Sequence, residues 1–144
     1  MGRTVNLPEG GEEIEIQLRW SDQDALGHVN NAKIVTLVEE ARVRWSGRHE
    51  GSELFEHGLV VASLKLDYLR PVYYSSCVMV RVGVQRIGTT SFVVRHIGYQ
   101  DGTPVFDASN VMVALAEDKV SSRPLNQQER SWLTERIFAD QQIS

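Results

Sequence analysis

Residues 31–47, NAKIVTLVEEARVRWSG, decide the fold of this chain. The apolar residues in this stretch recur at the spacing of a helix, namely at Ile34, Val35, Leu37, Val38, Ala41 and Trp45. Because the first two turns are unusually apolar, we expect the helix to be buried on more than one side. Asn30 or Asn31 is suited to cap its start, since a short amide side chain accepts a hydrogen bond from the otherwise unpaired first N–H groups.

The segments on both sides of this helix alternate as β-strands do. Before it, the run from Glu13 to Trp20 has polar residues on one face and apolar residues on the other, the latter being Ile14, Ile16, Leu18 and Trp20. After a loop at residues 48–58, we expect strands over residues 59–69, 78–87, 91–99 and 104–117. Asp101-Gly102 tolerates the positive φ angles of a tight hairpin turn, so successive strands should be antiparallel neighbours.

A short amphipathic helix is expected to close the chain over residues 126–138, after Pro124. The order of elements is then a strand, one long apolar helix, several antiparallel strands and a last helix. This order predicts the α+β class, with one antiparallel sheet wrapped around one buried helix. We find no repeat, low-complexity tract or linker, so residues 1–144 are expected to form a single domain with a core at about 13–117.

Composition excludes several classes of protein. The chain has 144 residues with 19 Asp and Glu against 15 Lys and Arg, and its formal charge of −4 argues against a nucleic-acid partner. Cys77 is the single cysteine, so no internal disulfide can form. The N-terminus has no apolar run of signal-peptide length, and no stretch approaches the roughly 20 apolar residues that span a bilayer. We expect a soluble cytoplasmic protein with no membrane partner.

Residues 21–31, SDQDALGHVNN, form the densest cluster of polar, potentially reactive side chains. They precede a helix whose first N–H groups can hold a carboxylate or a developing oxyanion. Asp24, Gly27 and His28 can bring a carboxylate, an unhindered backbone and an imidazole to one place. Residue types alone favour a simpler interpretation, in which Asp22 and Asp24 shape a turn and the asparagines cap the helix.

Other chemistries find less support in the sequence. A calcium loop beginning at Asp22 fails because Leu26 and Lys33 occupy positions that require oxygen ligands. The four histidines, with one cysteine, show no zinc-ligand spacing, so we expect neither metal nor bound cofactor. Cys77 adjoins a valine-rich strand and is better explained as a packed thiol than as a nucleophile. No nucleophile elbow, phosphate loop or dinucleotide fingerprint occurs.

Three segments together resemble the 4-hydroxybenzoyl-CoA thioesterase-like branch of the hotdog superfamily. They are residues 19–32, RWSDQDALGHVNNA; residues 67–72, DYLRPV; and residues 85–92, QRIGTTSF. The similarity of order and spacing covers roughly Glu13 to Ala116. It implies the hotdog fold and hydrolysis of an acyl-CoA to a free acid and coenzyme A, which is itself part of the substrate.

The resemblance also implies roles for individual residues. Asp24 would be the catalytic carboxylate, acting as nucleophile or as general base, and the backbone N–H of Asn31 would polarise the thioester carbonyl. His28 and Asn30 would orient Asp24 or the water, while Asp22 organises the turn. Coenzyme A would lie along a groove bordered by residues of the second and third segments, namely Arg70, Arg86, Gly88, Thr89, Thr90 and Ser91.

This groove departs from the family in one respect, because several hotdog thioesterases carry more basic residues where this chain has neutral Gly88-Thr89-Thr90. The resemblance further implies a homodimer or homotetramer with its active site at the subunit interface. Two alternatives remain open on the sequence. One is a hydratase or dehydratase, whose relatives use a His together with a Glu or Asp on the helix, whereas His28 precedes it here. The other is a non-catalytic acyl-CoA binding protein or sensor. Another hotdog lineage places its catalytic Glu on the helix, where this chain has Glu39 and Glu40, and this ranks below Asp24.

Overall fold

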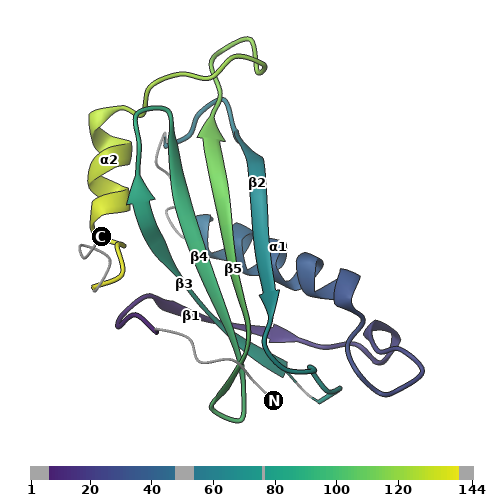
Figure 1. Cartoon of the computed structure of the whole chain (residues 1–144). Coiled ribbons are helices and arrows are strands. Elements are labelled where there is room, and N and C mark those ends of the chain that lie inside the picture. The colour runs from purple at the N-terminus through teal and green to yellow at the C-terminus, as the bar shows by residue number, and fades with distance from the viewer. Residues whose placement is uncertain (1–6, 48–53, 76, 140–144) are drawn as a thin grey trace.

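A five-stranded antiparallel sheet packs one face against a single long helix (Figure 1). The computed structural model describes residues 7–47, 54–75 and 77–139. The sheet order is β1-β3-β4-β5-β2. The elements are β1 (Glu12–Gln17), α1 (Asn31–Ser46), β2 (Leu59–Tyr68), β3 (Cys77–Ile87), β4 (Ser91–Gln100), β5 (Thr103–Ala114) and α2 (Gln127–Thr134). This is the α+β arrangement, a sheet around one helix, that the sequence predicts.

The core lies between α1 and the inner face of the sheet. Alternate residues of β3 point into it, and the facing side of α1 supplies the opposite wall, with Ile34, Leu37, Val38, Ala41 and Trp45 buried. The expectation that α1 is buried on more than one side is wrong for the single chain. Val35 and Val43 on its outer side are 38% and 58% exposed, because no second layer formed by the described residues covers that side.

The first strand is shorter than its alternation predicts. It ends at Gln17, and residues 20–22 form a 3₁₀ turn in which Trp20 is 73% exposed. The cause is the buried carboxylate of Asp22, which accepts hydrogen bonds from the Arg19 backbone N–H at 2.9 Å and from its guanidinium at 3.1 Å. These bonds curl the chain before the apolar pattern has ended, so Trp20 does not join the buried face.

The expected hairpin at residues 101–102 is confirmed, with φ angles of 51° at Asp101 and 77° at Gly102. β3, β4 and β5 are consecutive antiparallel neighbours, as predicted. β2 is the exception, because it pairs with β5 rather than with its successor β3, and so forms one edge of the sheet. This places the start of β2 beside the end of β5 and the end of β2 near the start of α1.

The last helix is also shorter than the predicted span of residues 126–138. Asn126 caps α2, which ends at Thr134, and the following residues return to the sheet. There Val84 N–H donates to the Arg136 carbonyl at 2.8 Å, and Phe138 N–H donates to the Val84 carbonyl at 3.0 Å. The Phe138 ring fills the space above Gly83, where a Cβ atom would lie 2.8 Å from it, so this glycine has a packing role. Within the described ranges, no helix is both long and apolar enough to cross a membrane.

Candidate active site

The loop between β1 and α1 folds into a tight turn around Asp24. Asp24 N–H donates to the His28 carbonyl at 2.7 Å, and Gly27 N–H donates to the Asp24 carbonyl at 3.2 Å. Gly27 has a φ of 82°, and no atom lies within 4 Å of a Cβ built on it, so its backbone faces open space. The glycine is therefore required by the turn conformation and leaves the approach to the loop unobstructed.

The carboxylate of Asp24 is held by one of its two oxygens. Oδ1 accepts hydrogen bonds from the Leu26 N–H at 2.8 Å and the His28 N–H at 3.1 Å. Among the described residues, no hydrogen bond reaches Oδ2, and the side chain is exposed in the single chain. Asp24 thus has a fixed orientation and one free oxygen, which is the arrangement that a general base or a nucleophile needs.

The residues after β2 contact this loop and fix its position. Val29 N–H donates to the Val72 carbonyl at 2.6 Å, and His28 forms an isolated β-bridge with Tyr73. The His28 and Tyr73 rings pack edge to face with their centroids 4.9 Å apart. The imidazole is half-buried by this contact, so His28 has a defined position beside Asp24.

The start of α1 completes the site. Asn30, one of the two predicted capping residues, is the cap, since its Oδ1 accepts from Ala32 N–H at 2.8 Å. In the part of the chain that the structure describes, no acceptor is recorded for the backbone N–H of Asn31. The Asn31 carbonyl accepts a hydrogen bond from the Tyr68 hydroxyl at 2.8 Å. The first turn of the helix is therefore tied to the end of β2, with a free N–H.

These groups border one open pocket of about 470 Å³. Its lining joins the loop, the first turn of α1 and the segment after β2, and consists of Asp24, His28, Val29, Asn30, Asn31, Ile34, Tyr68, Leu69, Arg70, Pro71 and Val72. Arg70, which the family resemblance places at the coenzyme A groove, thus lies in the same pocket as Asp24. Sequence reasoning gave no role to Tyr68 or Tyr73, although Tyr68 lies inside the quoted segment of residues 67–72.

The structure does not bring the hairpin of residues 86–91 to this pocket. The hairpin joins β3 to β4 at the end of the sheet far from the loop before α1 (Figure 1). Its carbonyls are held by the C-terminal part of the chain, since the Arg130 guanidinium donates to Gly88 O at 2.7 Å and Leu125 N–H donates to Thr89 O at 2.9 Å. Arg86, Gly88, Thr89, Thr90 and Ser91 are therefore separate from Asp24 within one chain.

The remaining acidic candidates have structural partners. Asp22 is buried, and although burial alone would raise its pKa, the hydrogen bonds and charge of Arg19 outweigh it and lower the pKa. Glu40 pairs with Arg44 at 2.8 Å, Glu39 lies 3.7 Å from Arg42, and neither lines the Asp24 pocket. Across the described ranges, no cluster of three His, Cys, Asp or Glu side chains is placed to hold a metal ion.

Comparisons with known proteins agree on one family. A family model described as the thioesterase superfamily matches residues 26–106. The long-chain acyl-CoA thioesterase FadM of Escherichia coli is 29% identical over 91 residues, which cover 59% of this chain and 67% of that protein. The uncharacterized protein YsmA of Bacillus subtilis is 29% identical over 106 residues, which cover 72% of each chain.

Solved structures give the same result. A thioesterase of Thermus thermophilus, complexed with coenzyme A and zinc, superposes with a TM-score of 0.76 and 31% identity, covering 85% of this chain and 91% of that one. A predicted thioesterase from Bacillus stearothermophilus superposes with a TM-score of 0.78 and 26% identity, covering 88% and 96%. With more than half of its length matched by the family model, the chain belongs to the thioesterase superfamily and is a hotdog-fold thioester hydrolase.

Proposed function

We propose that this enzyme hydrolyses an acyl-CoA thioester to a free acid and coenzyme A, with Asp24 as its catalytic carboxylate. The observation that carries the proposal is the geometry of Asp24, whose Oδ1 is fixed by two backbone N–H groups while Oδ2 stays free at the pocket beside the start of α1. Acyl-CoA as the substrate is supported by two relatives, one named a long-chain acyl-CoA thioesterase and the other solved with coenzyme A.

In this proposal the thioester carbonyl oxygen accepts a hydrogen bond from the free backbone N–H of Asn31. The positive end of the α1 dipole adds to the stabilisation of the oxyanion that forms there. The Tyr68 hydroxyl donates to the Asn31 carbonyl at 2.8 Å, which fixes the following peptide group and so restrains the Asn31 backbone. His28 supports Asp24 through its backbone N–H, Asn30 caps the helix, and Gly27 keeps the approach open.

Asp24 then has two routes by which it can promote hydrolysis of the thioester. As a nucleophile, its Oδ2 bonds to the acyl carbon and expels coenzyme A as a thiolate, and water cleaves the resulting anhydride. As a general base, it takes a proton from a water molecule while the water oxygen attacks the acyl carbon. The C–S bond then breaks, coenzyme A leaves as a thiolate, and Asp24 returns its proton to the thiolate. Both routes use the same carboxylate and the same oxyanion donor, and neither uses a metal or a bound cofactor.

The proposed active unit is a homodimer, which can pair further into a tetramer. β2 is an edge strand that exposes apolar residues, among them Val60, Val61 and Leu64, whereas the other edge, β1, carries glutamates. Charged edges resist pairing and apolar edges favour it. A partner would bring its own hairpin of residues 86–91 toward coenzyme A bound near Arg70. The neutral Gly88-Thr89-Thr90 of that hairpin would bind the phosphates through backbone and hydroxyl groups rather than through several charged side chains.

The test is Asp24→Asn, which keeps the size of the side chain and removes the basic carboxylate. We expect kcat for a panel of acyl-CoAs, followed by release of free thiol, to fall roughly 10²–10⁴-fold. Asp101→Asn is the matched control, since Asn tolerates the positive φ of that exposed turn. Full activity in Asp24→Asn would refute the mechanism, and tight coenzyme A binding without cleavage by the parent would favour a sensor.

A further inference from the structure

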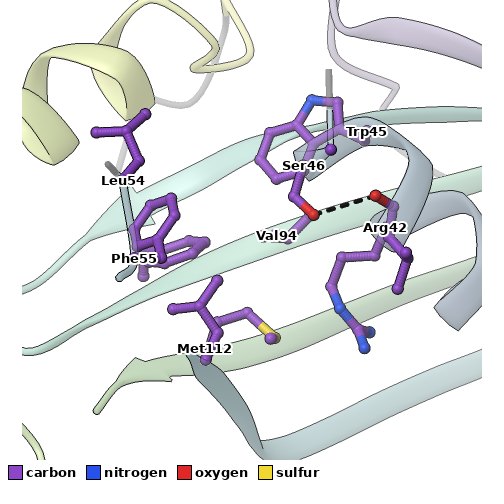
Figure 2. A pocket seen from close by; sticks show the side chains of 11 residues that line it. Arg42, Trp45, Ser46, Leu54, Phe55, Val94 and Met112 are labelled. Atoms are coloured by element: carbon purple, nitrogen blue, oxygen red, sulfur yellow. Dashed lines mark hydrogen bonds between the residues drawn. The ribbon is translucent and has the colours of Figure 1, made fainter. Parts of the chain in front are cut away.

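A second cavity, separate from the Asp24 pocket, lies at the C-terminal end of α1 (Figure 2). Its volume of about 420 Å³ falls within the ~300–1,000 Å³ typical of small-molecule sites. Most of its wall is apolar or aromatic, including Trp45, Phe55, Leu59, Phe92, Val94 and Met112. The wall of this cavity is therefore more apolar than that of the Asp24 pocket, which also carries Asp24, Asn30 and Arg70.

The polar groups in the wall of this cavity are engaged within the chain. The Ser46 hydroxyl donates to the Val43 carbonyl at 3.2 Å, the bond drawn as a dashed line in Figure 2. The Arg42 guanidinium donates to Asn110 Oδ1 at 3.2 Å, beneath the helix. Because these groups already have partners, the space between them suits an apolar group better than a charged one.

An acyl group cannot pass from Asp24 to the cavity of its own chain. Ile34 borders the Asp24 pocket and Trp45 borders the cavity, which at 1.5 Å per residue places them about 16 Å apart along α1. The helix face between them is filled by buried side chains, namely Leu37, Val38 and Ala41. Reaching the cavity by this route would require the core to open.

The edge strand β2 offers a different route, since its two ends border the two sites. Its first residue, Leu59, lines the cavity, and its last residue, Tyr68, lines the Asp24 pocket. Two-fold antiparallel pairing about the middle of this strand sets Tyr68 opposite Leu59 of the partner subunit, with the strands about 4.8 Å apart. The Asp24 pocket of one chain then adjoins the cavity of the other.

We propose that the acyl group of a substrate held at Asp24 enters the cavity of the partner subunit, and that the enzyme selects apolar acyl-CoAs long enough to fill it. This inference rests on the proposed function. In this arrangement Met112 and Val94 at the cavity wall determine which acyl lengths fit, and they act on the substrate held by Asp24 of the partner subunit. Short acyl groups leave the cavity empty and gain no binding energy from it.

The first test compares acetyl-, hexanoyl- and decanoyl-CoA. We expect kcat/KM of the parent to rise with chain length, and Met112→Phe, which fills the cavity, to lower the ratio of decanoyl to acetyl activity at least about tenfold. Val111→Phe, on the opposite face of the same strand, is the matched control. Ser46→Phe replaces Met112→Phe if that variant does not fold. An unchanged ratio in the cavity variants would overturn the proposal.

The second test uses hybrid dimers, purified through two different tags, that join one Asp24→Asn chain to one Met112→Phe chain. In the proposed arrangement, one site of the hybrid combines an intact Asp24 with an open partner cavity, so about half of the parental decanoyl-CoA activity returns. A cavity serving its own chain would restore none, which would refute the inference. Failure of the proposed function itself is distinguishable, because it would leave Asp24→Asn homodimers active on acetyl-CoA.

Discussion

The carboxylate of Glu129 on α2 is expected to be among the most sensitive positions for stability. It is fully buried and accepts four hydrogen bonds, two from the Arg123 guanidinium at 2.9 and 2.8 Å and one each from the backbone N–H groups of Asn126 and Phe55. Glu129→Gln preserves the shape, but its amide nitrogen must face donors that now lack an acceptor.

The size of the effect follows from this burial. The side chains of Arg123 and Glu129 are 20% and 0% exposed, and breaking a buried pair costs about 3–5 kcal/mol. We expect the lower end for the isosteric change, about 3 kcal/mol, which corresponds to a fall in Tm of roughly 10 °C. Glu135→Gln is the control, because that side chain is 75% exposed and its contact with Arg136 contributes at most about 1 kcal/mol.

The assay is urea unfolding at fixed protein concentration and at several pH values. Burial alone would raise the pKa of Glu129, but its hydrogen bonds, above all those from Arg123, outweigh burial and lower it below 4.5. A lowered carboxyl pKa stabilises the fold above the unfolded-state pKa, and this contribution is lost as the pH falls through the folded-state value. The difference in unfolding free energy between the parent and Glu129→Gln should therefore become smaller at acidic pH. Equal stabilities at pH 7 would refute the reasoning.

Three further changes have defined outcomes. Gly98→Ala puts a Cβ 2.2 Å from the Phe106 ring, so we expect a loss of at least about 1–3 kcal/mol of unfolding free energy in urea. Asn30→Ala removes the cap of α1 and should cost about 1 kcal/mol, while Asn30→Asp should restore it. Burial, followed by the charge of Arg42, lowers the pKa of His96 to about 3. Below pH 6.5 the His96 imidazole binds a proton in the unfolded chain but stays neutral in the folded chain. The free energy of unfolding should therefore decrease as the pH is lowered from 6.5 to about 3, and His96→Gln should remove this dependence on pH.

Local pattern in the sequence was sufficient for most of the fold. The spacing of Ile34, Leu37, Val38 and Ala41 identified α1, and Asp101-Gly102 identified the hairpin, because both signals are contained within a few neighbouring residues. Prediction from local pattern failed where a contact between residues outside that pattern determines the local structure. Trp20 leaves its strand because Asp22 is buried, which alternation of apolar residues cannot reveal.

The same limit applies to the candidate site. Asp24, His28, Asn30 and Asn31 are close in the chain and also close in space, so one motif located them together. The hairpin of residues 86–91 lies away from the Asp24 pocket of its own chain. Its predicted contribution to coenzyme A binding would therefore have to come from a second copy of the chain. The contact between Glu129 and Phe55 joins residues 74 positions apart, and no sequence periodicity spans that separation.

The hydrogen bond from the Tyr68 hydroxyl to the Asn31 carbonyl joins the last residue of an edge strand to the residue whose backbone N–H is proposed to hold the oxyanion. A partner strand that pairs with β2 would restrain Tyr68 and, through this bond, the Asn31 backbone. Because the single chain already forms this bond, pairing along β2 in the proposed homodimer would reinforce an existing restraint on the site.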